Sequence, residues 1–215
     1  DMLGSHALLG KGPNMYEEIA KIPFIVRWNG HSPAGAVVDR PISHIDLVPT
    51  FLEFFGQDSP EILHGESLLT VFSNPTVCDR ERVFLQFNRF ELDHDGFGAF
   101  SPTRCVTNRR YKLAINLSDK DELYDLETDA DELRNLIDDE AHGEIRDQLH
   151  REIVEWMNRT RDPFRGPQWI SRAWNGRAAS SWGGPTRPRP ADGFNQHTLL
   201  YDTAEPIDRL VYDKH

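Results

Sequence analysis

Hydrophobic and polar positions form their clearest pattern between residues 83 and 126, where short apolar runs alternate with polar turns. Polar stretches at 108–110 and 118–121 separate runs that are rich in apolar and β-branched residues. Consecutive short strands with such tight connections form an antiparallel meander. The pattern therefore predicts a small antiparallel sheet with strands at 83–87, 104–107, 111–116 and 122–126, and with a loop at 90–102.

The strongest helical pattern follows this region, at residues 139–160. Apolar side chains recur there at the helical period while charged residues fill the opposite face. The apolar positions are Ile145, Leu149, Ile153, Trp156 and Met157. A meander with one amphipathic helix on one face of the sheet makes a compact α+β subdomain.

The first 80 residues carry the pattern of the outer part of an α/β sandwich. A short helix at 16–20 precedes an apolar run at 22–28 that is typical of a strand buried on both faces. A helix capped by Asp46 and ended after residue 55 by Gly56 is expected next, followed by a short amphipathic segment at 66–72. The apolar side chains of the 46–55 helix are expected to be buried along one face: Leu47, Val48, Phe51, Leu52 and Phe55.

The composition changes after Asp162. Six of the fourteen prolines and three of the five tryptophans lie beyond this point. A tail with spaced aromatic residues is typical of a strap laid over a surface, either of its own domain or of a partner subunit. We therefore expect an α/β region at 1–80, an α+β subdomain at 81–162, and an extended tail at 163–215 that covers the active site or joins copies into a homo-oligomer.

Charge and cysteine content exclude several classes of protein. A formal net charge of −11 argues against nucleic acid or an anionic membrane surface as a partner. No apolar run approaches the roughly 20 residues that a membrane-spanning helix needs. Cys78 and Cys105 allow at most one disulfide and form no CxxC pair, which argues against a zinc–thiolate site. We expect the protein to be located in the bacterial cytoplasm or periplasm.

The candidate chemistry begins at Lys11, which lies between Gly10 and Gly12. Flanking glycines let the backbone approach a ligand, and the ammonium suits a compact anion such as sulfate or phosphate. The segment is not a phosphate-binding P-loop, because Gly12 follows the lysine where Ser or Thr is required. Taken alone, the segment is more typical of an exposed loop lysine than of an anion site.

Three further side chains are candidates for substrate binding. His6 lies five residues before Lys11, where it either donates to the same anion or is hydrogen-bonded within its own loop. Asp93 and His94 lie in a loop rich in Asp, Gly and Phe, which suits either contact with the organic part of a substrate or a solvated turn. His44 and His64 are interpreted as structural.

Five sequence motifs in order resemble the C-terminal portion of a sulfatase of the alkaline-phosphatase-like superfamily. They are the opening DMLGSHALLGKG; YEE at 16–18 with IPFIV at 22–26; SHIDLVPT at 43–50; GESLL at 65–69; and RYKL at 110–113 with ELYDLETD at 122–129 and NL at 135–136. The resemblance covers residues 1 to about 160. It implies an α/β fold that ends in a small α+β subdomain.

The resemblance implies that Lys11 stands at the place of the family's active-site lysine, which contacts the sulfate and the bridging ester oxygen. A fixed ammonium there lowers the cost of the negative charge that develops on the leaving oxygen. It also implies a formylglycine nucleophile, made from a Cys-x-Pro-x-Arg motif, and a divalent metal, expected to be Ca²⁺. Neither Cys78 nor Cys105 begins such a motif, so the nucleophile and the metal ligands are expected upstream of residue 1.

The chain is therefore interpreted as a C-terminal fragment that is inactive alone. Its expected partners are a sulfate-ester substrate and the N-terminal remainder of the same protein. Two alternatives stay open: a phosphonate or phosphate monoester hydrolase of the same superfamily, and a non-catalytic module for oligomerisation or recognition.

Overall fold

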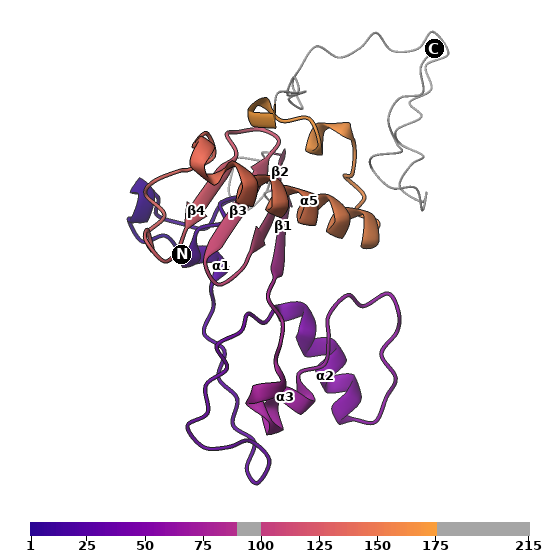
Figure 1. Cartoon of the computed structure of the whole chain (residues 1–215). Helices are drawn as coiled ribbons and strands as arrows, with labels where there is room; N and C mark the ends of the chain where they lie inside the picture. The colour runs from indigo at the N-terminus through magenta and orange to yellow at the C-terminus, as the bar shows by residue number, and fades with distance from the viewer. Residues whose placement is uncertain (90–99, 176–215) are drawn as a thin grey trace, which may run out of the picture. The chain divides into compact units, whose positions relative to one another are not determined.

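A computed structural model describes residues 1–89 and 100–175. The described residues fall into two units (Figure 1). Of the described residues, the first holds 1–20, 84–89, 100–106 and 110–175, and the second holds 21–83 with 107–109. Residues 1–20, which we call the opening segment, fall in the same unit as the strands of the later subdomain.

The first unit is built on a four-stranded sheet in the order β1-β2-β3-β4. The strands are β1 (Val83–Arg89), β2 (Phe100–Thr107), β3 (Tyr111–Asn116) and β4 (Glu122–Asp125). β3 and β4 pair antiparallel, with Leu113 opposite Leu123 and Lys112 opposite Tyr124. The predicted meander is confirmed. The loop predicted at 90–102 was too long, because β2 already begins at Phe100.

One face of the sheet packs on the long helix α5 (Gly143–Arg159), which follows the short turn η4 (Glu140–His142). Strand side chains alternate between faces, and the residues of this face share one apolar cluster with α5. Its fully buried members include Val106, Leu113, Ile115, Leu123, Leu149, Ile153 and Met157. The predicted amphipathic helix is confirmed, with Phe84 of β1 stacked on its Trp156 at 5.1 Å between ring centroids.

The opposite face of the sheet packs on the opening segment. Met15 joins Cys105 and Ala114 in a second buried cluster, with Leu85 and Phe87 packed against it. The helix α1 (Glu17–Ala20) follows directly, close to the predicted 16–20. Because both faces are covered, the sheet has an apolar core on each side.

The chain after α5 folds back onto its own subdomain, over the turns η5 (Pro167–Trp169) and η6 (Ala173–Asn175). We call residues 162–175 the strap. Trp169 is fully buried in the α5-side cluster. Asp162 forms a two-pronged ion pair with Arg104 of β2, at 2.5 and 3.0 Å, and both side chains are almost completely buried.

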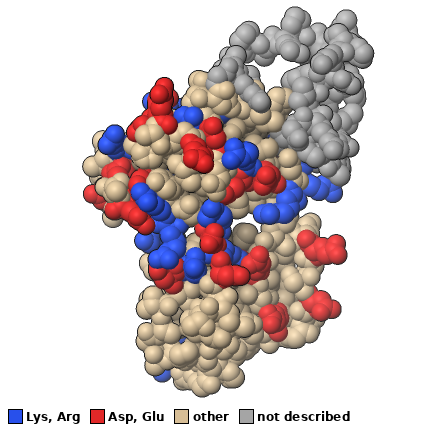
Figure 2. Space-filling view, viewed as in Figure 1, with Lys and Arg blue, Asp and Glu red and all other residues tan. Residues whose placement is uncertain are grey.

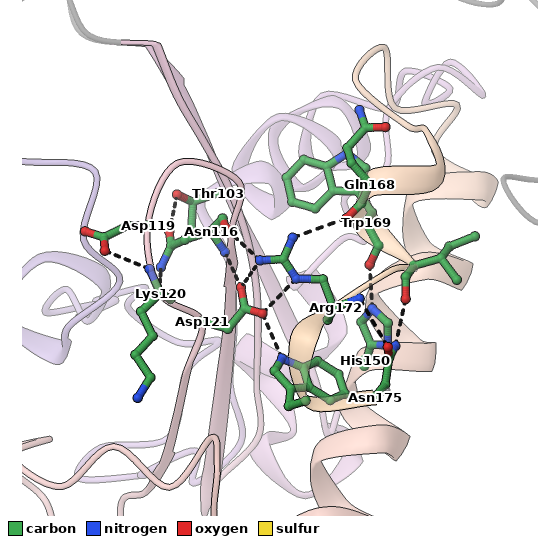
Figure 3. Close-up of polar contacts among 12 residues, drawn as sticks. Thr103, Asn116, Asp119, Lys120, Asp121, His150, Gln168, Trp169, Arg172 and Asn175 are labelled. Atoms are coloured by element: carbon green, nitrogen blue, oxygen red, sulfur yellow. Dashed lines mark hydrogen bonds and ion pairs between the residues drawn. The ribbon is translucent and has the colours of Figure 1, made fainter. Parts of the chain in front are cut away.

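A second buried ion pair lies further along the strap (Figure 3). Arg172 donates to both carboxylate oxygens of Asp121, at 2.8 and 2.6 Å, and to the carbonyl of Asn116 at 2.8 Å. Trp174 donates its indole N–H to the same carboxylate at 2.8 Å. These contacts place residues 162–175 on their own domain, which is one of the two arrangements expected of the tail. Residues 176–215 lie outside the described part.

His150 of α5 connects the helix to the strap. Its Nε2 lies 2.6 Å from the carbonyl oxygen of Trp169, and its ring meets Trp174 edge to face. Burial lowers the pKa of His150, although the Trp169 carbonyl and Asp121 act in the opposite direction. Asp147 also raises the pKa of His150, whereas Arg172 lowers it.

The lowered pKa of His150 predicts a loss of stability in acid. The unfolded chain takes up a proton near the ordinary value of about 6.5, whereas the folded chain does so only at lower pH. Stability is therefore fully present above that value and falls as pH drops below it, by at most ~1.4 kcal/mol per pH unit. Urea unfolding at pH 7.5 and 5.5 should show a smaller loss for His150→Gln than for the wild type. Equal losses would contradict the assignment.

The second unit holds η2 (His44–Asp46), α2 (Leu47–Phe54), α3 (Leu69–Ser73) and η3 (Pro75–Val77). Its centre is the fully buried Asp46, which accepts from the backbone N–H of Ser43 at 2.8 Å and of Glu66 at 3.0 Å and pairs with Arg80. Thr50 accepts from the N–H of Leu68 at 2.9 Å. The SHIDLVPT and GESLL motifs are therefore one structural unit.

Asp46 occupies the predicted N-cap position of α2, but its side chain makes no capping hydrogen bond to that helix. Ser43 is the N-cap of η2, and Asp46 is the third residue of a reciprocal capping box. Gly65 has a separate reason to be glycine, since a Cβ there would lie 2.0 Å from the carbonyl oxygen of Ile45.

The expected strand at 22–28 is wrong. Among the described residues 21–82 there is no strand, and Ile25 is 92% exposed. A strand that is buried on both faces needs neighbours for its backbone hydrogen bonds, and residues 21–82 supply none.

The buried apolar face expected for the 46–55 helix is also wrong for this chain. Pro49 and Thr50 are the buried positions of α2, whereas Val48, Phe51 and Phe55 are more than half exposed. In Figure 2 the surface of this unit is mostly tan, interrupted by separate Asp and Glu side chains. No helix within residues 1–89 and 100–175 is long and apolar enough to cross a membrane.

Candidate functional site

The opening segment folds as a tight loop that returns the chain on itself. Backbone hydrogen bonds join Met2 N to Gly10 O at 3.3 Å, Leu3 N to Leu9 O at 3.3 Å and Gly4 N to Leu8 O at 2.8 Å. The turn at its tip is η1 (Ser5–Ala7), preceded by Gly4 at a φ of 107°. Met2 is buried and anchors the loop from within. The loop is thus an ordered element.

Lys11 comes directly after this loop. Its Nζ lies 2.9 Å from the carboxylate of Asp1, and its side chain is 82% exposed. A surface ion pair of this kind is weak, so the ammonium is available to another anion. Lys11 therefore has the accessibility that an anion-contacting lysine requires.

His6 lies at the tip of the loop and packs on Tyr16. The two rings are 3.7 Å apart between centroids and nearly parallel. Tyr16 donates its hydroxyl to Glu122 of β4 at 3.2 Å, and burial followed by that carboxylate raises the pKa of the phenol. The Nε2 atom of His6 is enclosed and has no hydrogen-bond partner in the part of the chain that the structure describes.

Lys112 of β3 is the centre of a buried ionic cluster that the sequence analysis missed. Its Nζ lies 2.6 Å from Glu17, 2.8 Å from Glu132 and 2.8 Å from the carbonyl oxygen of Met15. Burial lowers its pKa, but Glu132 and the other negative groups outweigh burial and raise it overall. We call Lys112, Glu17 and Glu132 the lysine cluster. The available signal was a charged residue within the apolar strand YKLAIN.

The remaining candidates are placed as follows. Cys105 is fully buried, and burial raises the pKa of its thiol to about 12, so it is no thiolate nucleophile at neutral pH. Asp93 and His94 lie outside the described residues. The described residues contain no group of three or more His, Cys, Asp or Glu side chains that would hold a metal ion, and so they offer no site for the divalent metal.

Comparison with known proteins identifies the family. Residues 4–159 match the family model described as "N-sulphoglucosamine sulphohydrolase, C-terminal". The chain belongs to this sulfatase family. The match begins inside the opening loop, includes Lys11 and the lysine cluster, and ends at the last residue of α5.

Relatives of this chain support its assignment to the family. An uncharacterized sulfatase, YidJ of Escherichia coli (strain K12), is 42% identical over 216 residues, which cover 100% of this chain and 41% of that protein. A solved structure described as a 2-O GAG sulfatase has a TM-score of 0.67 and 25% identity, covering 77% of this chain and 35% of the other. A sulfatase solved with its substrate D-glucosamine-2-N,6-O-disulfate has a TM-score of 0.61 and 27% identity, covering 74% and 32%.

The chain spans less than half the length of these relatives. The solved relatives match it as mixed α/β structures, in agreement with the observed antiparallel sheet and long helix.

Proposed function

We propose that the full-length protein hydrolyses sulfate monoesters and that Lys11 contacts the sulfate group. The observation that carries this proposal is the exposed ammonium of Lys11, which follows an ordered loop within the segment matched by the sulfatase family. The two sulfatase structures cover 74% and 77% of this chain with TM-scores of 0.61 and 0.67, whereas a solved phosphonate monoester hydrolase covers 62% with a TM-score of 0.53. The proposal favours a sulfatase over a phosphonate or phosphate hydrolase.

The proposed role of Lys11 is electrostatic. Cleavage of the S–O bond moves negative charge onto the bridging oxygen, and a fixed ammonium near that oxygen stabilises the charge as it develops. The ion pair between Lys11 and Asp1 is exposed and weak, so the sulfate group of a substrate can replace the Asp1 carboxylate as the partner of the ammonium. Substrate contacts from His6, Asp93 and His94 belong to the same proposal.

The other parts of the site are proposed outside this chain. Sulfatases of this family use a divalent metal, and we propose Ca²⁺, together with a formylglycine nucleophile, in the N-terminal remainder. The exposed apolar side chains of α2 suit burial against that remainder, because Phe51 and Phe55 are costly to leave in water. An oligomer joined through residues beyond the strap stays a proposal.

Replacing Lys11 by alanine tests the role in catalysis. In the full-length enzyme, kcat/KM for an aryl sulfate should fall by more than about tenfold, or roughly 1.4 kcal/mol of transition-state stabilisation. Folding should stay intact, because an exposed loop lysine supports no core. Lys120→Ala is the matched control, since Lys120 is another exposed lysine in a surface ion pair, with Asp138.

A smaller loss for Lys11→Ala, or an equal loss for Lys120→Ala, would contradict the assignment. Parallel assays with an aryl phosphonate separate the two reaction classes. A higher kcat/KM for the phosphonate than for the sulfate would refute the sulfatase proposal.

A further inference from the structure

We propose that the lysine cluster is a positioning device for catalysis, which fixes the segment that carries Lys11 to the β-sheet. This inference rests on the proposed function of Lys11. It assigns to Lys112, Glu132 and Glu17 a role that acts through Lys11, without contact with the substrate.

The lysine cluster binds the chain a few residues after Lys11, at Met15 and Glu17. Lys112 reaches out of β3 to the carbonyl oxygen of Met15 at 2.8 Å and to the carboxylate of Glu17 at 2.6 Å. Glu132 accepts from the backbone N–H of Glu17 at 2.7 Å. Backbone atoms on both sides of residue 16 are therefore held by charged side chains from the sheet and from the loop after β4.

Further contacts connect the lysine cluster to the loop that precedes Lys11. Tyr16 lies between Met15 and Glu17 in the chain, donates its hydroxyl to Glu122 and stacks on His6. Ser5 donates to Glu18 and lowers the pKa of that carboxylate. The position of the His6 ring is thus fixed by residues 16–18. Backbone hydrogen bonds from Met2, Leu3 and Gly4 in turn fix the chain up to Gly10, the neighbour of Lys11.

Burial makes the cluster rigid and costly. The side chains of Lys112 and Glu132 are each 1% exposed, so both charges are removed from water. A hydrophobic contact of similar size would stabilise the fold at least as well. Glu132 also has a φ of 52°, in the left-handed region that non-glycine residues rarely adopt. Conformations of this kind persist where surrounding contacts enforce them, and they cluster at functional sites.

The alternating faces of the sheet separate this device from the rest of the core. Lys112 and Ala114 lie on the face covered by the opening segment, whereas Leu113 and Ile115 lie on the face covered by α5. The buried pair Arg104–Asp162 links β2 to the strap, and the Arg104 guanidinium lies 5.2 Å from the ring of Trp169 in the α5-side cluster. The protein thus contains a buried ion pair of similar character away from the Lys11 segment, which is a natural control.

A double-mutant cycle tests the inference in the full-length enzyme. Glu132→Gln keeps the side-chain size and an acceptor for the Glu17 N–H but removes the charge that holds Lys112. We expect it to lower kcat/KM for an aryl sulfate about tenfold in the presence of Lys11, and less than about twofold in a Lys11→Ala background. Glu17→Gln should behave in the same way. The non-additivity is the readout, because a purely structural loss would be the same in both backgrounds.

Asp162→Asn is the control for lost stability. It should lower the urea midpoint and leave kcat/KM within about twofold in either background, since coupling is expected only between groups of one network. Losses for Glu132→Gln that are equal with and without Lys11, or no loss with Lys11 present, would overturn the positioning role. A Lys11→Ala enzyme that retains its kcat/KM would instead refute the proposed function itself.

Discussion

Lys112→Met is expected to destabilise the first unit by about 3–5 kcal/mol, because the change leaves Glu17 and Glu132 facing each other without their counter-ion. Glu132 is 1% exposed and so has no access to water when Lys112 is lost. The Met15 carbonyl, buried against the same ammonium, would lose its donor as well. Urea unfolding of the full-length protein, followed through amide exchange in β3, measures the loss in the unit concerned.

A charge-neutral variant separates charge from packing. Lys112→Met combined with Glu17→Gln and Glu132→Gln removes all three charges together, and it should recover at least half of the lost stability, since a buried ionic group can be replaced by uncharged groups at little cost. A triple variant no more stable than Lys112→Met alone would show that packing, and not an unpaired charge, causes the loss.

Trp169→Ala is expected to cost a similar amount, about 3–5 kcal/mol. The Trp169 side chain is completely buried in the α5-side cluster, and its indole N–H donates to the Phe164 carbonyl at 2.8 Å. The ring also lies 5.2 Å from the guanidinium of Arg104, which pairs with Asp162. Its removal therefore leaves a cavity beside a buried charge. The urea midpoint of the first unit reports the loss.

Trp174→Ala is the matched control for this change. Trp174 belongs to the same strap but is only half-buried, and its main contacts are Asp121, His150 and Arg146. It should lose less than half as much stability as Trp169→Ala, because less apolar surface returns to water. Equal losses would show that the strap detaches as one piece whichever tryptophan is removed.

The sheet and α5 were predictable because their patterns are local. The strand at 111–116 and the helix period of Leu149, Ile153 and Met157 follow from spacing alone, and the structure has both. Asp46 shows the limit of local reasoning. Its position before an apolar run suggests a cap, but its carboxylate joins Ser43, Glu66 and Arg80, and the last two lie far along the chain.

The candidate site shows the same limit. Lys11 was proposed from its glycine neighbours and from the family resemblance, and its role stays a prediction. The lysine cluster was not, because a lysine within a strand normally indicates a solvent-facing side, and only the fold brings Glu17 and Glu132 to it. The strand expected at 22–28 fails for a related reason. An apolar run indicates burial within a complete fold, and residues 21–82 contain no neighbouring strand to which this run could hydrogen-bond.

The two covers of the sheet set an order for folding during synthesis. The opening segment leaves the ribosome before the strands and meets them as soon as Lys112 and Glu132 emerge. The other face is covered first by α5 and is completed only when Asp162, Trp169 and Arg172 have been made, 58 residues after Arg104 in the case of Asp162. Until then Arg104 and Asp121 have no strap to pair with, and the part of this face that Trp169 covers is exposed to other chains. Translational pausing or chaperone binding between residues 126 and 175 would therefore act while this face of the sheet is still incomplete.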